Sequence, residues 1–141
     1  MILVVMGSNE AVAEEVVKEF MTLFPAQCRR LYANHFAESG QRSAYLARAL
    51  TDAAYSSENV TLIPQVQTDG ELNMLRMRGA YVMHVYGALS SAHSDIQIDR
   101  RDYIVKRPSR VKHCPGHVMS VDEVMSDLQY RRRKMRREAV A

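Results

Sequence analysis

Short apolar runs alternate along the chain with longer stretches in which apolar residues recur every three or four positions. The short runs are rich in β-branched residues and predict strands that are covered on both faces, whereas the recurring positions predict amphipathic helices. The first strand is expected at residues 2–6 and ends at Gly7. The first helix is expected from Asn9 to about Phe24, because Pro25 does not continue it.

The same alternation continues along most of the chain. A further helix is expected at residues 41–55, and another follows Asp69-Gly70 and ends at Gly79. Further strands are expected at residues 29–34, 60–63, 80–86 and 103–105. Strands and helices that alternate at this spacing predict a parallel sheet joined by right-handed crossovers. The expected fold class is therefore α/β, a three-layer sandwich with a mainly parallel sheet.

A last helix is expected near the C-terminus. Ser120 and Glu123 have the spacing of a capping box, in which each side chain bonds the backbone amide of the other residue. Apolar residues follow at helical spacing as far as Leu128, and the helix then runs into the basic sequence "QYRRRKMRREAVA". We therefore divide the chain into a folded domain at residues 1–130 and a basic C-terminal tail at residues 131–141.

The composition is that of one globular domain with an uneven charge. The chain has 141 residues, of which 47% are apolar and 25% are charged, so it has enough apolar material for one core. Residues 1–99 carry 7 Lys and Arg against 11 Asp and Glu, whereas residues 100–141 carry 12 against 5. An anionic partner is therefore expected to bind the C-terminal part of the chain.

The sequence shows no targeting or membrane signal. No apolar run approaches the roughly 20 residues that cross a bilayer, and the start lacks the basic flank and cleavage site of a signal peptide. Cys28 and Cys114 are too few for a disulfide framework and are expected to be reduced thiols. These features favour a cytoplasmic protein that does not act at a membrane.

The first strand, turn and helix are arranged like a phosphate-binding loop. Gly7, Ser8 and Asn9 form the turn in "MILVVMGSNEAVAEEVVKEF", and free amides at a helix N-terminus attract anions. A kinase loop also needs a lysine beside the phosphates, but the first lysine is Lys18, inside the expected helix. The turn is therefore either a weak nucleotide or phosphate site, or only a connection between a strand and a helix.

Several later segments resemble those of a known kinase family. "HFAESGQRSAYLARAL" (residues 35–50) is similar to a Phe-Ala-Asp-Pro-Leu-Lys segment, and "QVQTDGELNMLRMRGAYVMHVYG" (residues 65–87) is similar to an Asp-Val-Arg-Phe-Pro-Asn-Glu segment. His93-Ser94-Asp95 is similar to a His-Ser-Glu element. In this order, the segments resemble the deoxynucleoside monophosphate kinases of tailed phages, in the nucleoside monophosphate kinase branch of the P-loop fold.

The resemblance implies a P-loop kinase-like fold with a defective site. It places a vestigial phosphate site at the Gly7 turn and a vestigial acceptor site at Glu38, Arg42, Glu71 and His93. Where the family has an aspartate and then an arginine, this chain has Gln65 and Gln67, and the turn lacks its lysine. Because phosphoryl transfer depends on positioned charge, these losses predict a pseudokinase with no catalytic residue and no cofactor.

The basic residues near the C-terminus form a candidate contact surface. A solvated helix end would explain some of them, because cations at a helix C-terminus favour its dipole. Their density favours an electrostatic contact with nucleic acid or an acidic protein. The candidate partner-binding residues are Arg107, Arg110, Lys112, Arg131, Arg132, Arg133, Lys134, Arg136 and Arg137.

Two further groups of residues favour structural interpretations. His113, Cys114 and His117 are possible metal ligands, but a structural zinc site needs a second pair of ligands, so no metal is expected. His84 lies within an expected buried strand and is interpreted as a core histidine with a hydrogen-bond partner rather than as a catalytic base.

Three functional hypotheses remain. The first is a catalytically impaired, phage-encoded kinase homologue, which acts as a binding or regulatory factor on a host protein or nucleic acid and has at most weak nucleotide affinity. The second is an active deoxynucleoside monophosphate kinase whose missing cation is supplied by Arg42, Arg48 or the basic loop at residues 106–112. The third is a nucleic-acid-binding module in which the α/β body only supports the tail.

Overall fold

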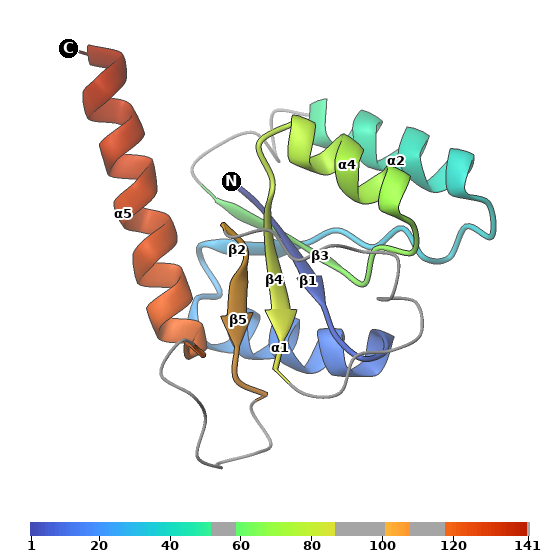
Figure 1. Ribbon diagram of the computed structural model, residues 1–141, viewed down its shortest axis with the longest axis horizontal. Coiled ribbons are helices and arrows are strands. Elements are labelled where there is room, and N and C mark those ends of the chain that lie inside the picture. Colours follow the sequence, from blue (N-terminus) through green and yellow to red (C-terminus); the bar gives the residue numbers. More distant parts are fainter. Residues whose placement is uncertain (52–58, 87–100, 108–117, 141) are drawn as a thin grey trace.

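The fold is a five-stranded parallel sheet covered by helices (Figure 1). The computed structural model describes residues 1–51, 59–86, 101–107 and 118–140. The strands are β1 (Ile2–Met6), β2 (Cys28–Arg30), β3 (Val60–Pro64), β4 (Tyr81–Val85) and β5 (Tyr103–Val105). The helices are α1 (Glu10–Leu23), α2 (Ser39–Thr51), α4 (Asp69–Met77) and α5 (Val121–Val140).

The sheet has the order β2-β3-β1-β4-β5, and every neighbouring pair is parallel. Apolar side chains of α1 and α5 pack on one face of the sheet and form one core cluster. Side chains of α2 and α4 form a second cluster on the opposite face. Strand residues such as Val4 and Val5 are fully buried because both faces are covered. The expected α/β sandwich with a parallel sheet is confirmed.

Local capping interactions explain where several helices begin and end. The Asn9 side chain accepts a hydrogen bond from the Val12 amide at 3.0 Å, so Asn9 caps α1. Gly79 has a φ of 85°, the left-handed conformation that ends a helix, just after α4. The amides of Ser120 and Glu123 each bond the other residue's side chain, as the sequence predicted for a capping box.

The second strand and the second helix differ from their expected boundaries. The strand expected at residues 29–34 is instead β2, which ends at Arg30. Leu31 and Ala33 are apolar because they are buried against α2 and α4, not because they continue the strand. Helix α2 begins at Ser39, two residues earlier than expected, and its expected end lies outside the described residues.

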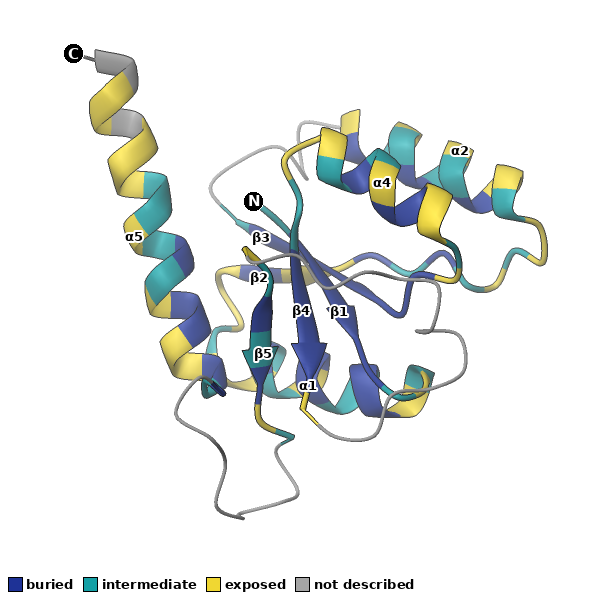
Figure 2. Cartoon of the chain, viewed as in Figure 1, coloured by how far each residue is buried: buried dark blue, intermediate teal, exposed yellow. Residues whose placement is uncertain are grey.

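Helix α5 extends well past the body of the molecule (Figure 1). Its first two turns are anchored by Val121, Val124, Met125 and Leu128, which are buried. The basic residues 131–140 continue the helix rather than form a separate coil. The described side chains in this second half of α5 are intermediate or exposed (Figure 2). No helix in the described part of the chain combines the length and apolar character needed to cross a bilayer.

Candidate functional site

The candidate site lies at the carboxyl edge of the sheet, where β1 and β3 end. These neighbouring strands are followed by α1 and α4, which cover opposite faces of the sheet. In open α/β sheets such a point, where the chain leaves adjacent strands in opposite directions, is where ligands bind. Gly7 follows β1 and Gln65 follows β3, so these two residues meet there.

A side-chain amide occupies the turn that resembles a phosphate-binding loop. The Gly7 amide donates a buried hydrogen bond of 2.9 Å to Oε1 of Gln65. Asn9 satisfies the Val12 amide in the first turn of α1, as described above. One amide of the candidate loop and one in the first turn of α1 are therefore already bonded inside the protein.

The close approach of α1 to the turn explains the glycine at position 7. A Cβ atom at Gly7 would lie 2.8 Å from the Ala13 nitrogen and 3.0 Å from both the Asn9 carbonyl oxygen and the Val12 Cβ. Any other residue would force the turn away from the helix. Gly7 is thus required by packing, whether or not an anion binds the turn.

Gln65 adopts a backbone conformation that residues other than glycine rarely have. Its φ is 48°, and only 6% of the residue is exposed. The Gln65 amide donates to the Val5 carbonyl at 2.8 Å, and its own carbonyl accepts from Nδ2 of Asn34 at 2.8 Å. The left-handed conformation directs the Gln65 side chain to Gly7 while its backbone remains bonded. Such strained positions cluster at functional sites and at places that the surrounding structure strongly constrains.

Arg42 and Glu71 form a buried ion pair between α2 and α4. Nε of Arg42 on α2 donates to Oε1 of Glu71 on α4 at 2.8 Å. Nη1 of Arg42 donates to the carbonyls of Phe36 and Ala37, both at 3.0 Å. The Gln67 amide donates to the other Glu71 oxygen at 3.3 Å. Only 1% of Glu71 and 8% of Arg42 are exposed, so the pair joins two helices and two loops.

The other predicted residues of the vestigial site are placed differently. Glu38 is exposed, and its carbonyl accepts from the Arg42 amide at the start of α2. Ser8 is half-buried next to Gly7. His93 lies outside the described residues. The structure therefore pairs Arg42 with Glu71, bonds Gly7 to Gln65, and leaves Glu38 at the surface.

His84 belongs to a second buried polar cluster, on β4. Its Nε2 lies 2.9 Å from an oxygen of Asp102, and both side chains are almost completely buried. Arg76 donates two hydrogen bonds to the same carboxylate, at 2.7 and 2.8 Å. The expectation that His84 is a core histidine with a partner is confirmed. The cluster ties α4 to the start of β5.

Two of the predicted partner-binding residues make contacts within the protein. Arg107 donates to both oxygens of Glu15 on α1, at 2.8 and 2.9 Å, and this ion pair raises the pKa of its guanidinium. Arg131 pairs with Asp127 at 2.9 Å and stacks over the rings of Tyr81 and Tyr103. Both arginines therefore have a structural role.

The remaining basic candidates differ in where they lie. Arg132 is half-buried beside the amino edge of the sheet, whereas Arg133, Lys134 and Arg137 are exposed on α5. Arg136 belongs to the same helix. Arg110 and Lys112 lie outside the described residues.

The cysteine and metal candidates add no reactive centre to the described site. Burial raises the pKa of the Cys28 thiol to about 11, so this thiol is protonated at neutral pH. His113, Cys114 and His117 lie outside the described residues. Within the residues that the structure describes, no three His, Cys, Asp or Glu side chains are grouped to hold a metal ion.

Sequence reasoning missed the roles of Gln65 and Asn34. The comparison of motifs identifies Gln65 only as a lost charge, although its position directly after an apolar strand marks it as a residue at the carboxyl edge. Nothing in the sequence signals its positive φ, because glutamine rarely adopts that conformation.

No protein-family model matches the sequence, and no curated protein matches it either.

Proposed function

We propose that this chain is a non-catalytic binding protein that contacts nucleic acid through the projecting half of α5. Its body is a nucleoside monophosphate kinase-like scaffold of phage origin, as the resemblance implies, with impaired phosphoryl transfer. The observation that carries the proposal is the group of exposed cations at Arg133, Lys134 and Arg137 on a helix that extends beyond the body (Figure 2).

The contacts of Gly7 and Arg42 support the proposal that phosphoryl transfer is impaired. Transfer needs amide donors and a cation aimed at the phosphates. Here the Gly7 amide is bonded to Gln65, and Arg42 is bonded to Glu71 and to two carbonyls. A substrate phosphate would have to displace these buried contacts before it gained any of its own.

The spacing of the cations on α5 supports a contact with a phosphate backbone. Arg133, Lys134 and Arg137 follow Tyr130 by three, four and seven residues, so the four side chains share one face of the helix. The ten residues from Arg131 to Val140 extend about 15 Å at the rise of an α-helix. A basic helix face with an aromatic side chain is a typical electrostatic footprint of nucleic-acid binding.

Binding to duplex DNA at several salt concentrations tests the proposal. We expect the affinity to fall steeply with salt, because bound cations release counterions from the phosphates. A variant with Arg133→Gln, Lys134→Gln and Arg137→Gln should bind weakly and reduce the slope of log affinity against log salt by about 2–3.

A second triple variant serves as the matched control. Arg29, Arg48 and Arg78 are exposed on the body, so changing all three to Gln removes the same charge from the chain. The control should retain most of the affinity and the salt slope. Equal losses in the two variants, or no measurable DNA binding by the native chain, would contradict the proposal.

A protein partner is the second candidate, because α5 also exposes apolar side chains. Tyr130 is 63% exposed and Met135 is 61% exposed. Apolar and adaptable side chains of this kind are frequent in protein interfaces. Salt-insensitive binding of one protein, lost in Met135→Ser, would favour this candidate over nucleic acid.

A further inference from the structure

The projecting half of α5, residues 131–140, begins where the buried contacts of the helix end. Leu128 is the last described side chain of α5 that is buried. Arg133 and Arg137 lie one helical turn apart, and like charges at this spacing destabilise a helix. A helix of this length is also marginal in water on its own. The projecting half therefore depends on contacts that hold α5 just beyond Leu128.

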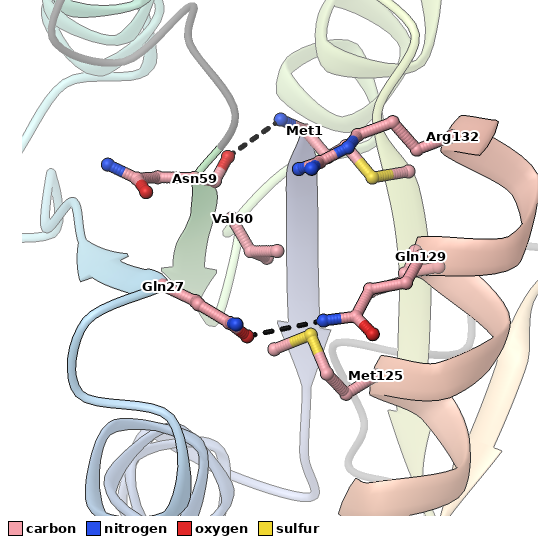
Figure 3. Close-up of a pocket in the computed structure, with 8 residues that line it drawn as sticks. Met1, Gln27, Asn59, Val60, Met125, Gln129 and Arg132 are labelled. Atoms are coloured by element: carbon pink, nitrogen blue, oxygen red, sulfur yellow. Dashed lines mark hydrogen bonds between the residues drawn. The ribbon is translucent and has the colours of Figure 1, made fainter. Parts of the chain in front are cut away.

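One such contact lies toward β2. Nε2 of Gln129 donates to Oε1 of Gln27 at 3.2 Å, at an exposed position (Figure 3). A cavity of about 150 Å³ lies beside this contact, and its lining includes Val60 and Leu128. The packing of α5 on the sheet is thus incomplete here, and an exposed hydrogen bond between two neutral amides contributes little to stability.

A second contact lies toward β4 and β5 and is made by charged and aromatic groups. Nε of Arg131 lies 2.9 Å from Oδ2 of Asp127, and the hydroxyl of Tyr103 donates to the same oxygen. The guanidinium carbon of Arg131 lies 5.3 Å from the ring centre of Tyr81 and 5.1 Å from that of Tyr103. We call Tyr81, Tyr103, Asp127 and Arg131 the α5 latch.

The two tyrosines give the α5 latch a rigid base in the sheet. Tyr81 is the first residue of β4 and Tyr103 is the first residue of β5, and these strands are parallel neighbours. Only 4% of Tyr103 is exposed. Burial, followed by the hydrogen bond to Asp127, raises the pKa of the Tyr103 hydroxyl. The phenol therefore stays protonated at neutral pH and remains a hydrogen-bond donor.

Asp127 connects this base to the helix. Asp127 precedes Arg131 by four residues, which is the favourable order for an acidic and a basic side chain on a helix. Both side chains are 35% exposed, so the pair is partly shielded from water. Its carboxylate contacts one group on β5 and one on α5, and Arg131 adds a cation–π contact with each tyrosine. The α5 latch thus fixes the turn from which the projecting half continues.

We propose that the α5 latch positions the projecting half of α5 for nucleic acid, so that Asp127, although acidic, strengthens the binding of a polyanion. This inference rests on the proposed function. A helix that is already ordered loses less conformational freedom when its cations bind phosphates. Electrostatic attraction alone gives the opposite sign, because the removal of an acidic side chain beside a basic face would strengthen the attraction to phosphates.

Amide hydrogen exchange of the full chain, followed by nuclear magnetic resonance, tests the α5 latch without nucleic acid. We expect Asp127→Asn to speed the exchange of amides in residues 131–140 about tenfold, because the turn loses its charged acceptor. Tyr103→Phe removes only a hydroxyl group and should speed this exchange about threefold. Native chemical shifts of the β1 amides would show that the core of each variant is intact. Unchanged exchange at residues 131–140 in both variants would overturn the proposal.

Binding of duplex DNA tests the positioning role. Asp127→Asn should weaken binding about fivefold, because the helix must then be ordered on binding. The slope of log affinity against log salt should stay unchanged, because no contact with phosphate is removed. Arg133→Gln, in contrast, should reduce this slope by about 1.

Glu138→Gln is the matched control, since it removes the same charge from an exposed position on the same helix. It should keep or slightly increase the affinity for DNA. Stronger binding by Asp127→Asn, or equal changes in the two acidic variants, would overturn the positioning role. Absence of DNA binding by the native chain would contradict the proposed function and the positioning role together, whereas the exchange rates alone decide whether the α5 latch orders the helix.

Discussion

Gln65 has a strained backbone conformation, and its side chain makes a buried hydrogen bond to the Gly7 amide. A left-handed backbone costs a residue other than glycine roughly 1–2 kcal/mol. That cost is offset because the conformation lets the Gln65 side chain bond the Gly7 amide while its own amide and carbonyl bond Val5 and Asn34. Gln65 follows β3, and its side chain bonds the turn that connects β1 to α1.

Substitution of Gln65 separates the hydrogen bond from the strain. We expect Gln65→Ala to lower the free energy of unfolding by about 1–3 kcal/mol, because the buried Gly7 amide loses its acceptor and the strain remains. Gln65→Gly loses the same acceptor but relieves the strain, so it should be more stable than the alanine variant by about 1 kcal/mol. Urea unfolding followed by circular dichroism measures both values. An alanine variant as stable as the glycine variant would show that the backbone at position 65 is not strained.

At the scale of elements, the Arg42–Glu71 pair connects α2 to α4. The guanidinium also bonds the carbonyls of Phe36 and Ala37, and Glu71 accepts from the Gln67 amide. Two residues assigned to an acceptor site thus hold two helices and the loops that precede them. Breaking a buried pair from one side leaves an uncompensated charge, which costs far more than the pair itself contributes.

A double-mutant cycle on this pair tests that interpretation. We expect Arg42→Met and Glu71→Gln each to reduce the free energy of unfolding by about 3–5 kcal/mol. The double variant should lose clearly less than the sum, because neither charge is then left buried alone. Arg42→Lys is the conservative control, which keeps the charge but loses the geometry that serves three oxygens. Additive losses in urea unfolding would mean that the two side chains act separately.

The sequence predicted the strands and helices better than it predicted the site. Strands β1 and β3 are recognisable because strands buried on both faces are nearly continuous apolar runs, with Thr61 as the polar residue in β3. The apolar pattern predicts the second strand too far along the chain, since burial of Leu31 and Ala33 produces the same pattern as a strand. The contact between Gly7 and Gln65 spans 58 positions in sequence and depends on the order of strands, which hydrophobic patterning does not specify.

At the scale of the whole molecule, the fold places two polar regions at opposite ends of the same strands. Gly7 and Gln65 lie at the carboxyl ends of β1 and β3, and Met1 and Asn59 lie at their amino ends. Each of these strands has five residues, which separates the two edges by about 16 Å. One small ligand therefore cannot contact both regions.

Phosphoryl transfer is therefore tested separately, with ATP, Mg²⁺ and each deoxynucleoside monophosphate at high protein concentration. We expect no diphosphate above a protein-free control, because the turn amide and Arg42 are held by internal contacts.

Arg107→Gln is the informative comparison. Arg107 bonds Glu15 at a partly exposed position, so its loss should preserve the fold, and a contaminating kinase would be equally active in both preparations. A transfer rate that falls about tenfold or more in this variant would assign a working phosphate site to this chain, because loss of one positioned charge has an effect of that size or larger on phosphoryl transfer.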